Sequence, residues 1–228
     1  MQCVILAGGY GTRISEESAL RPKPLVEIGG KPILQHIMQI YANHGITDFI
    51  ICGGYKVEMI SDWLSTAGLS RWNINVVDTG EGTLTGGRLL QIEDLVTDTF
   101  CMTYGDGVSD VNITDLIAYH HMGRQSATVT SVHELTRFGV LTIGRTGLVT
   151  AFEEKPPGWI NGGFFVLNRG IFSMIPGNVP WENEPMTRLA KCGELRSYRH
   201  HGYWQCLDTL REKLILDKLI AEGNAPWM

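Results

Sequence analysis

Short apolar runs alternate with longer amphipathic stretches through the first half of the chain. The apolar runs are typical of strands buried in a sheet, and stretches whose apolar positions recur every three or four residues predict helices. The predicted strands are residues 3–7, 49–52, 74–78 and 100–104, and the predicted helices follow the stripes at residues 33–41, 57–64 and 89–95. This alternation predicts an α/β fold with a Rossmann-like, mostly parallel sheet flanked by helices.

The second half of the chain is richer in predicted strands, which are residues 127–132, 139–143, 148–152 and 164–167. An amphipathic helix is predicted over residues 209–222. Because no linker, repeat or low-complexity tract separates the two halves, we expect a single domain over residues 1–228.

The first predicted strand runs directly into a glycine-rich turn, Gly8-Gly9-Tyr10-Gly11-Thr12-Arg13. Ligands of such sheets bind beyond the C-terminal ends of the strands, where bare backbone N–H groups can wrap phosphates. Glycines let the main chain approach a ligand closely and take φ values that a side chain would forbid. Arg13 and Lys23 add two positive charges suited to a triphosphate. The turn therefore predicts a site for phosphoryl or nucleotidyl transfer.

Two commoner glycine motifs do not fit this chain. A dinucleotide-binding loop needs a third glycine where Ile14 stands, and a Walker-type loop needs a hydroxyl where Pro32 follows Gly30 and Lys31. The plain alternative is a tight turn that binds nothing, and the nearby charges of Arg13 and Lys23 disfavour it.

Two aspartates stand where they could bind a metal ion. Asp106 lies between two glycines directly after a predicted strand, and Asp208 precedes the last predicted helix. A carboxylate with open backbone on both sides suits a hard cation such as Mg²⁺. Each aspartate also has a structural interpretation, because Asp favours turns and can cap a helix.

Composition narrows the class of protein. The chain has 228 residues, of which 43% are hydrophobic and 19% charged, as expected of a soluble globular protein. Its formal net charge of -5 argues against a surface for nucleic acid or membranes, and neither a signal peptide nor a spanning segment is expected. The five cysteines show no paired spacing, which indicates a reduced, cytoplasmic protein.

The chain resembles the sugar nucleotidyltransferases, also called nucleoside-diphosphate-sugar pyrophosphorylases. Their signature L-A-G-G-x-G-T-R followed by K-P stands here as Leu6 to Arg13 with Lys23-Pro24. Further matches are residues 104–107, 153–156, 161–165 and 204–209, so the resemblance covers nearly the whole chain. Residues 84–88, 161–165 and the Pro-Trp ending are most similar to the glucose-1-phosphate cytidylyltransferase group. One departure is a segment between Leu64 and Trp72 that is shorter than in that group.

The resemblance implies a fold of the nucleotide-diphospho-sugar transferase type and a defined reaction. A sugar 1-phosphate would attack the α-phosphorus of a nucleoside triphosphate and release pyrophosphate, with CTP and α-D-glucose 1-phosphate giving CDP-glucose as the favoured pair. The same chemistry on UTP, dTTP or another phosphorylated acceptor is one alternative, and an inactive nucleotide-sensing subunit is another. Mg²⁺ as cofactor and a homo-oligomeric assembly are also implied, without nucleic-acid or membrane partners.

The resemblance also implies roles for individual residues. Arg13, Lys23 and Asp106 would be catalytic, and Asp106 and Asp208 would hold the metal ion. Residues 1–110 would bind the nucleotide, through Leu6, Ala7, Gly8, Gly9, Gly11, Thr12, Arg13, Lys23, Thr83, Gly86, Arg88 and Gly105. Residues 111–228 would bind the sugar phosphate. The implied contacts are Tyr104, which lies near the end of the first half, and Gly139, Glu154, Lys155, Asn161, Gly162 and Trp204 from the second half. Solvent-exposed loops at Thr83 and Glu154, and a plain turn at Asn161, are the competing interpretations.

Overall fold

A seven-stranded sheet runs through the centre of the molecule. The structure is a computed structural model that describes residues 1–135, 139–154 and 157–228. The strand order is β12-β8-β11-β6-β1-β4-β5, and every strand except β11 runs in the same direction. The mostly parallel sheet predicted from the sequence is thereby confirmed. The strands are β1 (Gln2–Leu6), β4 (Asp48–Gly53), β5 (Asn73–Asp78), β6 (Thr99–Tyr104), β8 (Ala127–Leu135), β11 (Pro157–Asn168) and β12 (Leu195–His200).

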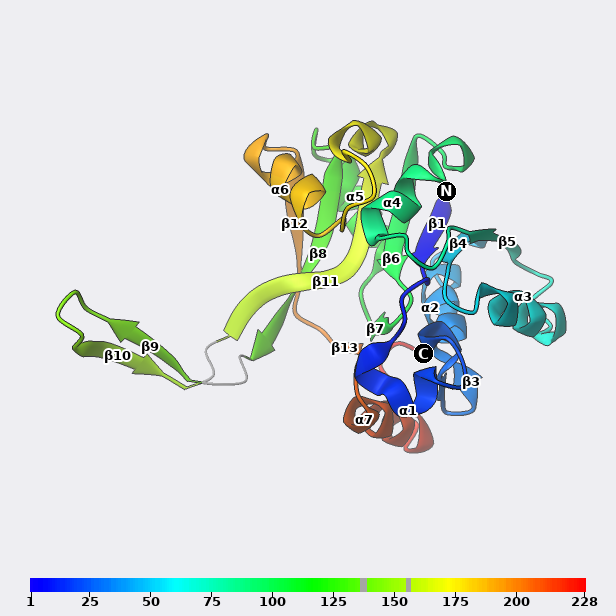
Figure 1. The fold of residues 1–228 in the computed structure, drawn as a ribbon, viewed down its shortest axis with the longest axis horizontal. Coiled ribbons are helices and arrows are strands. Elements are labelled where there is room, and N and C mark those ends of the chain that lie inside the picture. Colours follow the sequence, from blue (N-terminus) through cyan, green and yellow to red (C-terminus); the bar gives the residue numbers. More distant parts are fainter. Residues whose placement is uncertain (136–138, 155–156) are drawn as a thin grey trace.

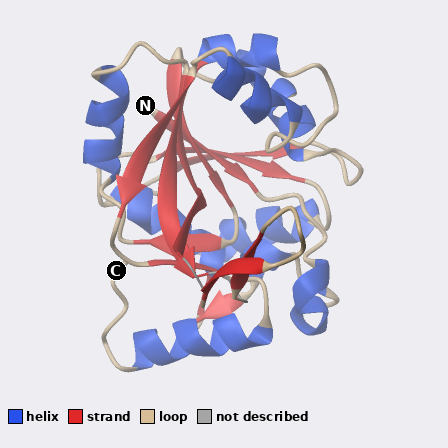
Figure 2. Cartoon of the chain, turned by 90° about the vertical axis from the view of Figure 1, so that its left-hand side faces the viewer, coloured by secondary structure: helices blue, strands red, loops and turns tan. Residues whose placement is uncertain are grey.

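Helices cover both faces of this sheet, as Figures 1 and 2 show. They are α1 (Ser15–Ser18), α2 (Ile33–Ala42), α3 (Val57–Thr66), α4 (Thr85–Leu90), α5 (Ile113–His121), α6 (Glu184–Lys191) and α7 (Leu210–Ala221). Short 3₁₀ turns span Thr12–Ile14, Lys23–Leu25, Glu93–Leu95 and Arg169–Met174. None of the helices in the described ranges is long and apolar enough to cross a membrane.

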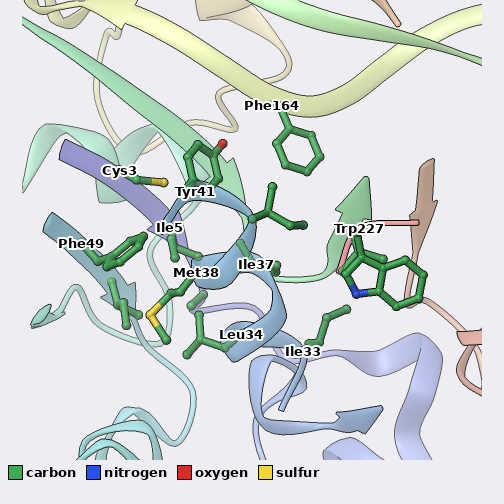
Figure 3. Packing of buried hydrophobic residues seen from close by; sticks show 14 of the residues in the cluster. Cys3, Ile5, Ile33, Leu34, Ile37, Met38, Tyr41, Phe49, Phe164 and Trp227 are labelled. Carbon is green, nitrogen blue, oxygen red and sulfur yellow. The ribbon is translucent and has the colours of Figure 1, made fainter. Parts of the chain in front are cut away.

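Successive residues of the central strands point into two separate cores, one on each face of the sheet. Cys3 and Ile5 of β1 belong to one core, and Val4 and Leu6 belong to the other. Figure 3 shows the first core, in which α2 packs its apolar side chains against β1 and β4. The second core is closed by α4, α6 and the 3₁₀ turn Arg169–Met174. Burial on both sides explains why these strands are uninterrupted apolar runs in the sequence.

Three two-stranded pairs complete the described part of the fold. β2 (Glu27–Ile28) pairs with β3 (Lys31–Pro32), and β7 (Gly107–Ser109) pairs with β13 (Trp204–Cys206). The third pair, β9 (Val140–Ile143) and β10 (Val149–Glu153), is an antiparallel hairpin that projects from the body of the molecule (Figure 1). We call this hairpin the arm. Its strands leave every side chain exposed to solvent.

The hydrophobic pattern does not predict α5, α6 or β12, and each has a physical reason. Buried His120 occupies an apolar position of α5, and α6 buries only Pro185 and Leu189. β12 is an edge strand whose residues are all at least partly exposed. The predicted helix over 89–95 is wrong as one element, because α4 ends at Leu90 and a separate turn follows at Glu93–Leu95.

Candidate active site

A cavity of about 510 Å³ opens where β1 and β6 end. The glycine turn after β1, the segment after β6 and the loop before α4 form its walls. Every residue of the predicted nucleotide-binding set except Gly86 lines it, together with Tyr104, Asp106 and Asp208. Its lining residues are Leu6, Ala7, Gly8, Gly9, Tyr10, Gly11, Thr12, Arg13, Lys23, Pro24, Glu81, Gly82, Thr83, Leu84, Thr85, Arg88, Tyr104, Gly105, Asp106, Pro180, Glu182 and Asp208.

The glycine turn is tied to the neighbouring strands at its start and bends at Gly11. The Ala7 N–H donates to the Cys52 carbonyl at 2.9 Å, and the Gly105 N–H donates to the Leu6 carbonyl at 3.0 Å. Gly11 has φ +65, and the Ser18 hydroxyl donates to its carbonyl at 2.9 Å.

The sequence predicts that all three glycines of the turn adopt unusual φ values and let a ligand approach closely. The structure corrects this prediction. Only Gly11 of the three takes a positive φ. A Cβ at Gly8 would lie 2.1 Å from the Arg88 guanidinium carbon, so a protein side chain requires this glycine. A Cβ at Gly9 would meet no protein atom within 4 Å, which leaves the space in front of Gly9 open toward the cavity.

Two cations and two carboxylates form an ion-pair network on the floor of the cavity. Lys23 Nζ lies 2.6 Å from Asp106 Oδ2 and 2.6 Å from Asp208 Oδ1. Arg13 Nη1 lies 2.7 Å from Asp208 Oδ2. The Lys23 side chain is only 12% exposed, whereas that of Arg13 is 75% exposed. Four residues that are far apart in the sequence therefore meet at one point of the cavity.

Burial and pairing shift the pKa values of two members of this network. Burial opposes the charge of Lys23, but Asp106 and Asp208 outweigh burial and raise the pKa of Lys23. Burial also disfavours the Asp208 carboxylate, yet Lys23 and Arg13 together lower the pKa of Asp208. Both groups are therefore charged at neutral pH.

The helix-capping interpretation of Asp208 is excluded by the start of α7. Thr209 is the N-cap residue, and its side chain forms a capping box with Glu212. Glu212 also accepts a hydrogen bond from the Asp208 N–H at 2.6 Å. The Asp208 carboxylate consequently takes no part in capping α7 and instead binds Lys23 and Arg13 in the cavity.

The two aspartates fit a magnesium ion. Because both carboxylates bind the same ammonium group, they converge on one position. Mg²⁺ in nucleotide sites usually takes one or two carboxylates and completes its shell with water and substrate phosphates. Within residues 1–135, 139–154 and 157–228, no group of three or more His, Cys, Asp or Glu side chains could hold a metal ion by itself. The donor set thus suits a cation bound jointly by protein and nucleotide.

The loop that precedes α4 is anchored rather than free in solvent. The Thr83 hydroxyl donates to the Thr79 carbonyl, and the Leu84 N–H donates to Asn178 Oδ1 at 2.8 Å. Gly86 lies outside the cavity lining, because its N–H donates to the Val179 carbonyl and a Cβ there would lie 2.6 Å from that oxygen. Gly86 therefore serves packing, while Thr83 lines the cavity.

A second, smaller cavity of about 30 Å³ shares Tyr104 and Asp106 with the first. Asn161, Gly162 and Trp204 of the predicted sugar-phosphate set line it. The Trp204 indole N–H donates to the Gly162 carbonyl at 2.7 Å, and the Asn161 amide donates to the Tyr104 hydroxyl at 3.2 Å. Here the pairing of β11 with β8 shifts register, as β-bulges often do beside functional sites.

Two other members of the predicted sugar-phosphate set, Gly139 and Glu154, do not line either cavity. A Cβ at Gly139 would lie 2.4 Å from the Phe152 ring and 3.0 Å from Glu154 Oε2, so Gly139 and Glu154 lie together at the base of the arm. Neither residue belongs to the two cavity linings. Lys155 lies outside the described residues.

Sequence reasoning missed Glu182, which lines the large cavity opposite the glycine turn. The Thr85 hydroxyl donates to Glu182 Oε2 at 2.7 Å. Burial, and then the Glu182 carboxylate that accepts a hydrogen bond from Tyr104, raise the pKa of that tyrosine. Glu182 stands in a polar stretch with no motif around it, and only the fold brings it beside Tyr104. No signal in the sequence distinguishes it from a solvated glutamate.

Comparisons with known proteins show which family the chain belongs to. The nucleotidyl transferase family model matches residues 2–194. The chain is 46% identical, over 254 aligned residues, to the glucose-1-phosphate cytidylyltransferase of Salmonella typhimurium, covering 100% of this chain and 98% of that protein. The alignment is longer than the 228 residues of this chain, so the relative has residues that this chain lacks.

Solved structures show the same fold. HddC from Yersinia pseudotuberculosis superimposes with a TM-score of 0.79 at 23% identity, covering 96% of this chain and 99% of that chain. The same protein in complex with GMP-PN gives a TM-score of 0.76 at 22% identity. The chain thus has the nucleotide-diphospho-sugar transferase fold expected from its sequence. With a family model over most of its length and a relative of this similarity over all of it, the protein is an enzyme of the nucleotidyl transferase family.

Proposed function

We propose that this enzyme joins CTP to α-D-glucose 1-phosphate, forming CDP-glucose and releasing pyrophosphate. The observation that carries the proposal is 46% identity over the whole chain to a protein named glucose-1-phosphate cytidylyltransferase. The cavity supports the same chemistry, because it combines a glycine turn, two cations and two converging carboxylates.

In the proposed reaction an oxygen of the sugar phosphate attacks the α-phosphorus of CTP. A phosphorus–oxygen bond forms there, the bond to the β-phosphate oxygen breaks in line, and pyrophosphate leaves with the electron pair. A phosphate monoester loses its second proton near pH ~6, so the nucleophile is already an anion at neutral pH. The enzyme therefore needs no general base, and its task is to position two polyanions and offset their repulsion.

We assign the phosphates of CTP to the glycine turn, Arg13 and Lys23. The backbone of Gly9 is accessible from the cavity, and the exposed side chain of Arg13 can contact the pyrophosphate as it leaves. In the structure Lys23 instead binds both aspartates. A cation bound to the same aspartates would take the place of its ammonium group, which would leave Lys23 to contact the nucleotide phosphates.

Asp106 and Asp208 are the residues that would hold Mg²⁺. When bound, the ion would neutralise negative charge on the phosphates of the two substrates. The anchored loop over residues 79–85 would contact the base through backbone groups and the Thr83 hydroxyl. We further assign the glucose moiety to the Tyr104 side of the large cavity, next to Asn161 and Trp204, with Lys155 on the attacking phosphate and Glu154 on a sugar hydroxyl.

In this proposal the chain is one domain whose two halves bind different substrates. Residues 1–110 would supply most of the nucleotide site, and residues 111–228 would supply the sugar-phosphate site. We also propose a cytoplasmic location, since Cys3, Cys52 and Cys101 are buried free thiols.

A turnover assay tests the proposed function. The protein is incubated with glucose 1-phosphate, Mg²⁺ and one triphosphate at a time, namely CTP, UTP, dTTP, ATP or GTP, and pyrophosphate release is followed. Turnover with CTP at least tenfold faster than with any other triphosphate is expected. Faster turnover with another triphosphate would overturn the choice of CTP, and no turnover with all five would overturn the proposed activity itself.

We propose in addition that the enzyme is a homo-oligomer assembled through the arm. An isolated two-stranded hairpin is marginally stable in water. The paired positions Leu141 with Phe152 and Ile143 with Val149 give one face of the arm four apolar side chains that are 51–62% exposed. A second copy of the chain would cover this face.

Sedimentation velocity tests the assembly. The wild type is expected to sediment as an oligomer, and a Leu141→Ser, Phe152→Ser double variant as a smaller species. Met122→Ser is the matched control, because Met122 is an exposed apolar side chain away from the arm. A monomeric wild type at micromolar concentration, or an unaltered double variant, would contradict the proposal.

A further inference from the structure

Arg88 is a buried arginine whose hydrogen bonds all go to protein oxygens. The residue lies on α4 and is 3% exposed. Its Nη1 donates to the Gly53 carbonyl at 2.7 Å and to the Thr79 hydroxyl, and its Nη2 donates to the Gly8 carbonyl at 2.9 Å and to the Glu81 carbonyl at 3.5 Å. These acceptors account for the four N–H groups at the end of the side chain.

The acceptors belong to three neighbouring strands of the sheet. Gly8 follows β1, Gly53 ends β4, and Thr79 follows β5. The Gly8 carbonyl belongs to the glycine turn, and Thr79 begins the loop that would contact the base. One guanidinium group therefore connects the two segments to which we assign the phosphates and the base of the nucleotide.

No carboxylate of the described residues forms an ion pair with Arg88, although the charge of Asp78 favours its protonated form from farther away. Its hydrogen-bond acceptors there are carbonyls and a hydroxyl. Burial lowers the pKa of Arg88, yet arginine stays protonated at neutral pH. Burying a charge is costly, and carbonyl and hydroxyl oxygens make all of the direct contacts that offset this cost for Arg88.

Two glycines are required by the position of this side chain. A Cβ at Gly8 would lie 2.1 Å from the guanidinium carbon, and a Cβ at Gly54 would lie 2.5 Å from Nη1. The guanidinium cannot move aside freely, because its hydrogen bonds hold it in place. The backbone of both strand ends is consequently pressed against Arg88.

We propose that Arg88 is a positioning residue that fixes the glycine turn relative to the base-binding loop. This proposal rests on the proposed function for the identity of the ligand. Arg88 acts through the backbone that it holds, and its N–H groups are already occupied. Loss of the guanidinium group should therefore make the glycine turn more mobile and lower kcat/KM for the nucleotide, while the sugar-phosphate site is unaffected.

Hydrogen–deuterium exchange tests the positioning without reference to activity. In Arg88→Lys, the Tyr55 amide, which donates to the Gly8 carbonyl, and the Thr79 amide, which donates to the Gly53 carbonyl, are expected to exchange at least tenfold faster than in the wild type. Arg196→Lys is the matched control, since Arg196 donates to the Tyr119 carbonyl at 2.9 Å away from both cavities. Unaltered exchange at Tyr55 and Thr79 in Arg88→Lys would overturn the proposal even if the enzyme has no activity with CTP.

Steady-state kinetics supply the second readout. Arg88→Lys should lower kcat/KM for CTP by about 10- to 100-fold, the size of one hydrogen bond to a charged group, while KM for glucose 1-phosphate stays within twofold. Arg196→Lys should leave both KM values unaltered. An equal rise of both KM values would indicate a general loss of structure and contradict the positioning role.

A double variant links Arg88 to its glycine. Gly8→Ala should abolish turnover because the new methyl group collides with the guanidinium. Combining Gly8→Ala with Arg88→Lys should restore part of the turnover, since the slender lysine leaves room for the methyl group. A double variant no better than Gly8→Ala alone would show that Gly8 is required for another reason and would count against the proposed contact.

Discussion

Replacing Lys23 with methionine should move metal affinity and turnover in opposite directions. Lys23 Nζ is bound to both proposed metal ligands, Asp106 and Asp208, at 2.6 Å. A divalent cation that binds these carboxylates must first displace the ammonium group. Methionine keeps the length of the side chain but removes that competitor, so metal binding in the absence of nucleotide should become tighter.

The structure sets the size of this effect. Exposed ion pairs contribute up to about 1 kcal/mol each, and Lys23 makes two contacts with a side chain that is only 12% exposed. We therefore expect a gain of about 1.5–2 kcal/mol, which corresponds to roughly 10- to 30-fold tighter binding. Turnover should fall by about 10²- to 10³-fold, because a preorganised charge near the reacting phosphates is lost.

Isothermal titration with Mn²⁺ measures the metal affinity, and pyrophosphate release measures turnover. Lys213→Met is a matched control, because Lys213 pairs with Asp217 at 2.9 Å and is similarly buried on α7. The control should bind Mn²⁺ as the wild type does. If Lys23→Met binds Mn²⁺ no more tightly than the wild type, the two aspartates are not the metal ligands or Lys23 does not compete for them.

Three further outcomes are expected. Asp106→Asn should raise the Mg²⁺ concentration for half-maximal turnover at least tenfold, and an unaltered requirement in a Mg²⁺ titration would remove Asp106 from the metal site. Thr209→Ala should lower the free energy of unfolding by about 1 kcal/mol in urea, because the capping box of α7 is lost, and an unaltered midpoint would refute this. Burial lowers the pKa of His36, which contacts the Ile28 carbonyl and Trp227, so the unfolded chain binds its proton at higher pH than the folded chain. The stabilisation that neutral His36 contributes is thus complete above about pH 6.5 and declines as the pH falls below that value. In urea unfolding at pH 8 and pH 5.5, His36→Gln should show a smaller loss of stability between the two pH values than the wild type. An equally large loss in the variant would contradict this role of His36.

The sequence predicts the part of the fold that depends on neighbouring residues. The strand around Val4 and the strand around Met102 are buried on both faces, so their apolar runs are unambiguous. The turn that follows β1 and Asp106 after β6 could then be placed at the same edge of the sheet, which the structure confirms.

What the sequence does not predict depends on residues that meet only in the folded chain. Arg196 and Arg199 interrupt the apolar pattern of β12, because an edge strand leaves its side chains partly exposed. The requirement for glycine at position 8 comes from Arg88, which is far along the chain. Whether Asp208 caps α7 or enters the cavity is settled by Thr209, whose side chain takes the capping position.

The contact of Arg88 with Gly8 and Gly54 constrains how the sequence can evolve. A lineage that keeps the arginine cannot accept even alanine at either glycine. One that has lost it can vary Gly8, while a Cβ at Gly54 would still lie 2.9 Å from the Gly80 carbonyl oxygen. Single substitutions pass through an intermediate with a steric collision or an empty space, so selection acts on the three positions jointly. Across homologues, covariation among them should therefore be stronger than their separation along the chain would suggest.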